Sequence, residues 1–430
     1  MQTLKKFIKY YKPYKTVFFI DLLCATIISA IDLAFPQLLR TLTKTLFAGA
    51  PGKIISALIP ITIGLLVAYI IQTACRYYVT YAGHMMGARM ERDMRKELFD
   101  QYEKLSFSYY DQNNSGQMMS KLVSDLFDIS ELAHHGPENL FISLIKIIGS
   151  FIFLFMINRM LAVPMLILVV LMLVFSYGQN KKMQETFMDN RRKIGDINSS
   201  LQDTLAGIRV VQSFANERIE QEKFNRSNEN FLISKDANYR CMGSFMSGNA
   251  FFQGMMYLVT LVFGGFLIAH GRMEASDLAM YALYIGIFIS PIQILVELTE
   301  MMQKGLSGFR RFLEVVETEP DIVDAADAKP LKNVKGKVCY EDVSFHYSDD
   351  DTPVLSHVSF EIPAGKSIAL VGPSGSGKTT LIKLILGYYS VIEGRICIGS
   401  TNINDVNKQW WRRQCGVVMQ DGVIFSESIA

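Results

Sequence analysis

Six long apolar segments constrain the fold more than any other feature of this sequence. They run over Val17–Leu39, Ile54–Tyr81, Pro137–Ile157, Leu161–Gly178, Ser244–His270 and Asp277–Met302. Each approaches or exceeds the roughly 20 residues that a helix needs to cross about 30 Å of hydrocarbon. Hydrophobic residues make up 50% of the chain, which argues against an ordinary soluble enzyme. We therefore expect an all-α membrane domain with six spans over residues 17–317.

The connections between these segments are unequal, and their charges predict an orientation. Residues 82–136 and 179–243 form two long connections rich in lysine and arginine, whereas the short connections hold few basic residues. The amino terminus adds Lys5, Lys6, Lys9, Lys12 and Lys15. Since basic residues concentrate on the inner side of a membrane, the terminus and both long connections are predicted to be cytoplasmic in a multi-pass protein of the cell membrane.

Residues 1–16 mix aromatic residues with lysines, which suits an amphipathic helix in the inner headgroup layer, with a disordered basic tail as the alternative. The first apolar segment resembles a signal peptide, but Asp21 and Asp32 interrupt it and five further spans follow. Helix-forming residues of alternating charge predict that the membrane helices continue through both long connections, with a break near Gly207.

A phosphate-binding motif lies late in the chain. Gly372, Gly377, Lys378 and Thr379 fit the pattern G-x-x-x-x-G-K-[ST]. Glycines at this spacing let successive backbone N–H groups face phosphate oxygens, and a following helix adds the positive end of its dipole. The sequence predicts a strand over Lys366–Val371 before the loop and a helix from Lys378 after it. Lys378 is expected at the β- and γ-phosphates and Thr379 on Mg²⁺.

With this motif in place, nearly the whole chain resembles a half-transporter of the ATP-binding cassette (ABC) exporter family. The segment "FSYYDQNNSGQMMSKLVSDL" is similar to the family's first cytoplasmic connection, around Gly116 and Ser120–Asp125. "LQDTLAGIRVVQSFANE" is similar to the second, around Gly207, Val211 and Phe214. The resemblance implies that each connection carries a short coupling helix that rests on a nucleotide-binding domain.

The resemblance also implies the nucleotide site. Tyr347 matches an aromatic residue that stacks on adenine, and Gln420 matches a glutamine that approaches Mg²⁺ and the γ-phosphate. The implied site for ATP and Mg²⁺ comprises Tyr347, Gly372, Pro373, Ser374, Gly375, Ser376, Gly377, Lys378, Thr379, Thr380 and Gln420, with Thr379 and Gln420 toward the metal. A partial α/β P-loop NTPase domain is expected over residues 336–430, after an acidic, proline-containing linker over residues 318–335.

In this family two half-transporters form composite sites, so a homodimer or heterodimer is implied. The implied cargo is an amphipathic drug, lipid or peptide. The signature motif, the Walker B carboxylates and the switch histidine expected in the family do not occur before Ala430. We therefore expect the 430 residues to belong to a longer protein and expect doubtful hydrolysis by this chain alone. A truncated, non-hydrolysing regulatory subunit that depends on a full-length partner is the alternative.

Other features are less informative. A net charge of +2 implies no nucleic-acid partner, and the six scattered cysteines indicate neither a disulfide framework nor a metal site. Lys146 and Asp32 lie inside predicted spans, where ionisable residues line a polar path or form a buried ion pair, and both readings remain open. A membrane-anchored P-loop kinase does not explain the two coupling-type connections, and an importer permease does not carry its cassette on the same chain.

Overall fold

The computed structural model describes residues 2–47, 49–325, 328, 330, 336–347 and 352–418. The chain forms two compact units. The helical unit comprises Met1–Arg92 and Phe127–Phe309, and the mixed unit comprises Asp93–Leu126 and Arg310–Ala430. The middle part of the first long connection, residues 93–126, therefore belongs to the mixed unit, although the connection lies between two membrane-type helices in the sequence.

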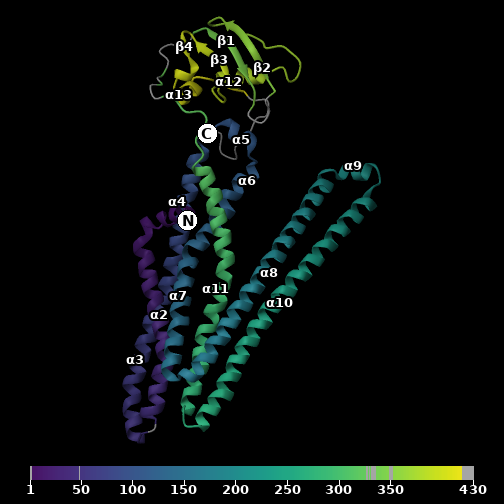
Figure 1. Ribbon diagram of the computed structural model, residues 1–430. Helices are drawn as coiled ribbons and strands as arrows, with labels where there is room; N and C mark the ends of the chain where they lie inside the picture. Colours follow the sequence, from purple (N-terminus) through teal and green to yellow (C-terminus); the bar gives the residue numbers. More distant parts are fainter. Residues whose placement is uncertain are drawn as a thin grey trace. The chain divides into compact units, whose positions relative to one another are not determined.

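The long apolar segments are helical (Figure 1). In chain order the helical elements are α1 Gln2–Lys9, η1 Lys12–Tyr14, α2 Lys15–Thr41, η2 Leu42–Leu46, α3 Pro51–Tyr78, η3 Val79–Gly83, α4 His84–Tyr102, α5 Phe107–Gln112, α6 Ser115–Ser120, η4 Lys121–Asp125, α7 Leu126–Ile157, α8 Arg159–Ala206, α9 Ile208–Ser213, α10 Glu217–Ala269 and α11 Ala275–Val316. Within the described part of the chain, six helical stretches are long and apolar enough to cross a membrane, which confirms the predicted six-span architecture.

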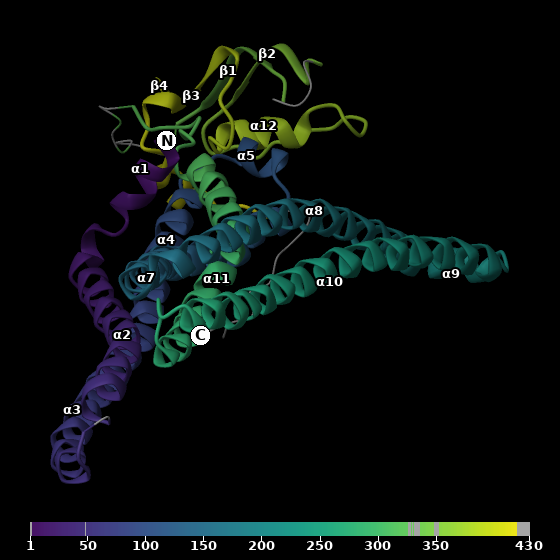
Figure 2. The same ribbon diagram turned by 60° about the horizontal axis from the view of Figure 1, so that its bottom comes forward.

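The helices α8 and α10 form a long hairpin that closes through α9 (Figures 1 and 2). The 48 residues of α8 extend over about 70 Å at 1.5 Å per residue, more than twice the hydrocarbon thickness. A Cβ atom on Gly248 would lie 2.2 Å from the Phe175 ring, so glycine permits the close approach of the two helices. The helix α8 ends at Ala206 with Gly207 as its cap, as predicted.

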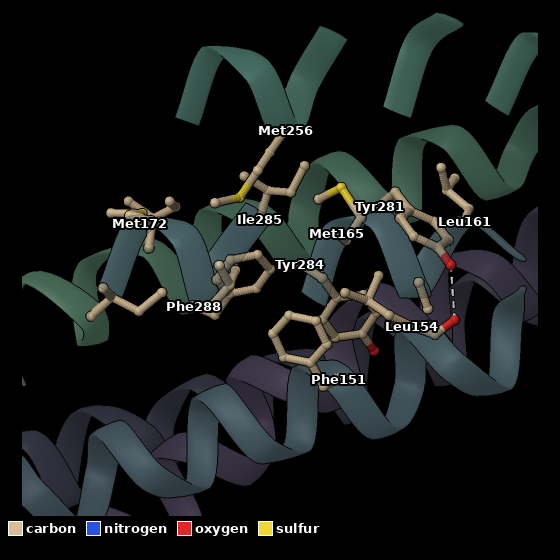
Figure 3. Close-up of a cluster of buried hydrophobic side chains, with 14 of the residues drawn as sticks. Phe151, Leu154, Leu161, Met165, Met172, Met256, Tyr281, Tyr284, Ile285 and Phe288 are labelled. Atoms are coloured by element: carbon tan, nitrogen blue, oxygen red, sulfur yellow. Dashed lines mark hydrogen bonds between the residues drawn. The ribbon is translucent and has the colours of Figure 1, made fainter. Parts of the chain in front are cut away.

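Apolar side chains from several helices fill the core of the helical unit, and buried hydroxyl groups find backbone partners (Figure 3). Tyr281 donates to the carbonyl oxygens of Leu154 at 2.9 Å and Asn158 at 2.7 Å. Tyr284 donates to the carbonyl oxygen of Leu33 at 2.9 Å. These bonds remove the cost of burying each phenol and link α11 to α7 and α2.

The amino-terminal segment that contains α1 packs against other helices of the helical unit. The Phe7 ring lies edge-on to Phe309 at 5.1 Å, and the Tyr11 hydroxyl donates to the carbonyl oxygen of Ala133. The predicted position of this segment in the headgroup layer stays a prediction, because it concerns lipid.

The mixed unit contains a four-stranded antiparallel sheet in the order β2-β1-β3-β4. Its remaining elements are β1 Val338–Phe345, β2 Leu355–Ile362, α12 Lys378–Ile385, β3 Glu393–Ile398, β4 Thr401–Asn402, η5 Ile403–Asp405 and α13 Lys408–Arg413. Val338 opposes Ile362 on one side and Ile398 on the other, so β1 is central among the described strands. Tyr340, Phe345, Leu384 and Trp411 belong to one buried cluster that joins the sheet to α12 and α13.

The strand predicted over Lys366–Val371 is absent from this part of the structure, and that prediction was wrong. The segment has no strand assignment, and Val371 is 94% exposed. Strand propensity expresses a fit to neighbouring strands rather than an intrinsic preference. The described strands pair only among themselves, so Lys366–Val371 has no ladder to join.

A partly buried ion pair fixes the end of α11 within the mixed unit. Arg311 holds Asp125 through two parallel bonds, Nε to Oδ2 at 2.7 Å and Nη2 to Oδ1 at 2.6 Å. The Asp125 side chain is 9% exposed, and bidentate pairing supplies the hydrogen bonds that such burial requires. The contact joins η4, at the end of the first long connection, to the helix that leads into the sheet.

Candidate nucleotide-binding site

The loop before α12 has a backbone that requires glycine at two positions. Gly375 and Gly377 both have a φ of +81°, in the left-handed region that other residues adopt at a cost. At Gly377 a Cβ atom would also lie 2.7 Å from Leu355 Cδ2 and 3.2 Å from the Val354 carbonyl oxygen. The two conformations turn the chain sharply into the helix, as a phosphate-binding loop requires.

The helix α12 begins at Lys378 directly after this loop, with Gly377 as its cap. Its first two threonines point to different environments. Thr379 is exposed, whereas Thr380 is buried and shares a hydrogen bond of 3.1 Å with the Tyr347 hydroxyl. Thr379 is therefore the hydroxyl available beside a bound phosphate, and Thr380 holds the helix to the rest of the unit.

The Lys378 side chain folds back over the loop. Its Nζ donates to the carbonyl oxygens of Gly372 at 2.9 Å and Pro373 at 2.7 Å and to Ser376 Oγ at 3.2 Å. Within the described ranges no carboxylate forms an ion pair with it. An uncompensated ammonium group thus stands beside backbone amides and a helix amino terminus, a combination that favours a polyanion.

The opposite side of α12 is anchored to the sheet. Tyr340 on β1 is buried, and its hydroxyl donates to the Leu381 carbonyl oxygen at 2.9 Å. Burial raises the pKa of Tyr340 well above its ordinary value, so the hydroxyl remains a donor at neutral pH. This bond fixes the first turns of the helix, and with them the loop.

Tyr347, the residue implied in adenine stacking, lies next to this assembly. Its ring is perpendicular to Tyr389 at 5.3 Å and nearly perpendicular to Phe345 at 5.0 Å, and Lys383 Nζ lies 5.5 Å from its centre. The ring is half-buried, and its hydroxyl is bound to Thr380. Its role toward adenine stays a prediction.

A second set of contacts joins the end of α12 to the first long connection. Phe107 on α5 stacks on Tyr388 with centroids 4.2 Å apart and planes 19° apart. The Tyr389 hydroxyl donates to Asp111 Oδ2 at 2.5 Å. Arg412 lies 5.3 Å from the Tyr388 ring and donates to the Leu386 and Gly387 carbonyl oxygens. The short helix α5 thus packs on the segment that directly follows α12.

Comparison with known proteins decides the family. Residues 18–292, more than half of the chain, match the ABC transporter transmembrane region, and residues 355–430 match the family described as ABC transporter. The chain belongs to the ABC transporter family. It is a multi-pass membrane protein with an ABC-type nucleotide-binding region, and membership implies ATP binding.

Several curated proteins are similar to this ABC transporter chain along nearly its whole length. It is 38% identical over 426 residues to the uncharacterized ABC transporter ATP-binding protein YwjA of Bacillus subtilis, covering 99% of this chain and 73% of that protein. It is 28% identical over 434 residues to an ATP-dependent lipid A-core flippase of Syntrophus aciditrophicus, covering 100% and 70%. A solved bacterial Atm1-family ABC exporter with ATP bound shares the fold, with a TM-score of 0.76, 19% identity and coverage of 96% and 73%.

The structure brings most of the predicted ABC site residues together. Gly372 to Thr380 form one loop and helix start, and Tyr347 is linked to it through Thr380. Gln420 lies outside the described residues. Thr379 remains the described candidate toward Mg²⁺.

The sequence analysis predicted that the segment beginning at Phe107 rests on the nucleotide-binding region, but it did not single out the residues that make this contact. The resemblance pointed to Gly116 and Ser120–Asp125, whereas contact with the end of α12 comes from Phe107 and Asp111. The signal available was the pair Tyr388–Tyr389 directly after the α12 sequence, two aromatic residues with no evident role in phosphate binding.

The stacking prediction can be tested by separating the Tyr347 ring from its hydroxyl. Tyr347→Ala is expected to weaken ATP binding by about tenfold or more, because base–aromatic stacking contributes about 1–3 kcal/mol. Tyr347→Phe keeps the ring and loses only the bond to Thr380, so its affinity is expected to stay within about threefold of the wild type. Titration of the full-length protein with a fluorescent ATP analogue measures both. Equal affinities for the two variants would exclude the stacking role.

Proposed function

We propose that this chain is one half of a dimeric ATP-driven exporter that moves an amphipathic molecule across the cell membrane. The observation that carries the proposal is the packing of α5 on Tyr388 and Tyr389. These two residues come three and four positions after the end of the helix that starts at the phosphate loop, and α5 lies between the second and third apolar helices in the chain. A change at the nucleotide therefore has a covalent and packed route to the membrane helices.

Each residue of the predicted nucleotide site would have its own role toward ATP and Mg²⁺. Backbone N–H groups of Ser374–Thr379 would surround the phosphates, and Lys378 would exchange its three loop acceptors for phosphate oxygens. Thr379 would hold Mg²⁺, which neutralises phosphate charge when bound. A second chain would complete the composite site, and closure of the two sites would displace the segment after α12 together with α5.

The helix α5 is connected along the chain to a membrane-type helix on each side. Toward the amino terminus, α4 ends at Tyr102, only four residues before α5. Toward the carboxyl terminus, α6 and η4 lead into α7, and the Arg311–Asp125 pair ties this end to α11. We infer that α4, α7 and α11 move together with the nucleotide-binding region, which lies on the cytoplasmic side according to the distribution of basic residues.

The cargo proposal draws on relatives and on the spans. One relative is named a lipid A-core flippase, and another, 26% identical over 440 residues, is named a putative multidrug export protein. In the helical unit Lys146 Nζ lies 2.7 Å from Asp32 Oδ2, and Gln72 donates to Asp32 Oδ1 at 2.7 Å. These mutual bonds favour a structural ion pair between spans over a role in cargo binding, so we place the cargo against apolar side chains.

The test is transport by the full-length gene product in proteoliposomes. Addition of Mg-ATP to the side bearing the nucleotide domain is expected to drive movement of a fluorescent phospholipid or an amphipathic dye to the other side. Lys146→Met, which removes the charge from the ion pair, is expected to change stability more than cargo preference. ATP hydrolysis without movement of either probe class would contradict the proposal. Movement that requires a different, catalytically complete partner chain would favour the regulatory-subunit alternative.

A further inference from the structure

Three histidines from two helices converge in the helical unit. His84 begins α4, and His134 and His135 are neighbours on α7. Their ring centroids are 4.5 Å apart for His84 and His134, 5.0 Å for His84 and His135, and 4.0 Å for His134 and His135. One metal-ligating atom from each residue lies within 4.8 Å of the other two. Half of the six histidines in the chain therefore occupy one place.

Hydrogen bonds to the backbone fix the tautomers of two of these rings. His84 Nδ1 donates to the Thr80 carbonyl oxygen at 2.6 Å, and His134 Nδ1 donates to the Ser130 carbonyl oxygen at 2.8 Å. In a neutral imidazole that arrangement leaves the Nε2 lone pair free to accept. Metal-binding histidines commonly carry this bond from the second ring nitrogen, because it orients the ring.

One ring nitrogen of the buried His134 side chain is unsatisfied among the described residues. The residue is 3% exposed, and its Nε2 has no hydrogen-bond partner among the described residues. A buried acceptor without a partner costs about 1–3 kcal/mol. The buried nitrogen belongs to a ring whose centroid lies within 4.5 Å of those of His84 and His135.

The backbone around the cluster is shaped to bring the helices together. A Cβ atom on Gly87 would lie 2.8 Å from His134 Nδ1 and 2.9 Å from Ser130 Oγ, so only glycine permits this approach of α4 to α7. The π-helical turn η3, Val79–Gly83, ends immediately before His84, and such turns often occur at functional sites.

Two carboxylates flank the same turn. A Cβ atom on Gly83 would lie 3.5 Å from Asp21 Oδ1 and 3.9 Å from Glu138 Oε2. Asp21 is buried, and its Oδ1 has no hydrogen-bond partner in the described part of the chain.

We propose that His84, His134 and His135 bind a divalent transition-metal ion of the Zn²⁺ class and thereby link α4 to α7. Three imidazole nitrogens suit Zn²⁺, Co²⁺ and Ni²⁺ far better than Mg²⁺ or Ca²⁺. Tetrahedral ligation at about 2.0–2.1 Å places ligand nitrogens about 3.3 Å apart, which is shorter than the present limit of 4.8 Å between the ligand atoms. Glu131, whose Oε2 lies 3.8 Å from His135 Nε2, is available to orient that ring. This inference does not depend on the transport function.

The experiment uses the full-length protein purified with a histidine-free tag and stripped of metal by a chelator. Titration with Co²⁺ is expected to give the ligand-field absorption of a tetrahedral site, saturating at one ion per chain and displaced by Zn²⁺. His84→Gln is expected to weaken the binding by at least about 100-fold, because loss of a ligand exceeds the 10–100-fold effect of losing an outer-shell partner. His84 is exposed, so the variant is expected to fold, and the unchanged melting temperature of the metal-free protein checks this.

His270→Gln is the matched control. His270 is also exposed, and its Nδ1 makes the same kind of bond, to the Phe266 carbonyl oxygen at 2.9 Å, but it follows the end of α10 and belongs to no group of three metal-ligating side chains among the described residues. This variant is expected to bind Co²⁺ like the wild type. His135→Gln provides a second ligand test if His84→Gln unfolds. Absence of the Co²⁺ bands in the wild type, or equal affinities for the ligand variants and the control, would overturn the proposal.

Discussion

Replacement of Lys378 by alanine is expected to lower Mg-ATP hydrolysis by the full-length protein at least about 100-fold. Lys378 Nζ is the cationic donor at the mouth of the loop, with three acceptors within 3.2 Å that belong to the loop itself. Loss of one preorganised donor to a developing anionic charge typically costs 10²–10³ in rate. Phosphate release from the purified protein, measured at saturating ATP, reports the effect.

Lys366→Ala is the control for this change. It also removes one positive charge from an exposed lysine, and it lies in the segment that leads into the loop. Because it has no place in the phosphate site, hydrolysis is expected to remain within about twofold of the wild type, as for most surface substitutions. A Lys378→Ala protein that retains more than about a tenth of the wild-type rate would remove the lysine from the assigned role.

The phosphate loop was predictable because its chemistry is local. The positive φ angles of Gly375 and Gly377, and the return of Lys378 over the loop, follow from nine consecutive residues. The six spans were predictable for a similar reason, since length and composition alone decide whether a helix can cross a bilayer.

The features that escaped prediction depend on distant partners. A strand over Lys366–Val371 would need a neighbouring strand to pair with. The four described strands pair with one another and not with this segment. Phe107 meets Tyr388 across more than 250 residues of chain, and nothing in either local sequence identifies the other. The histidine cluster escaped prediction for the same reason. His84 and His134 lie on different helices, and Gly87, which has no side chain, lets these helices approach each other.

The α5 contact predicts a second large effect, the separation of hydrolysis from transport. The double variant Phe107→Ala, Asp111→Ala removes the stack on Tyr388 and the bond from Tyr389 while leaving the phosphate loop untouched. Stacking contributes about 0.5–1.5 kcal/mol and a hydrogen bond to a charged group about 1.5–3 kcal/mol. Their joint loss is expected to reduce transport at least tenfold, with ATP hydrolysis remaining within about threefold.

The ratio of cargo moved to ATP hydrolysed in proteoliposomes is the decisive quantity, since it separates loss of coupling from loss of folded protein. Met119→Ala is the matched control, because Met119 is 59% exposed on α6 in the same connection and is not part of the α5 contact. If the double variant and the control give the same ratio, α5 does not transmit the nucleotide-driven motion. If the double variant loses hydrolysis as well, the contact supports the loop itself, because displacement of Tyr388 and Tyr389 then reaches back through α12 to Lys378.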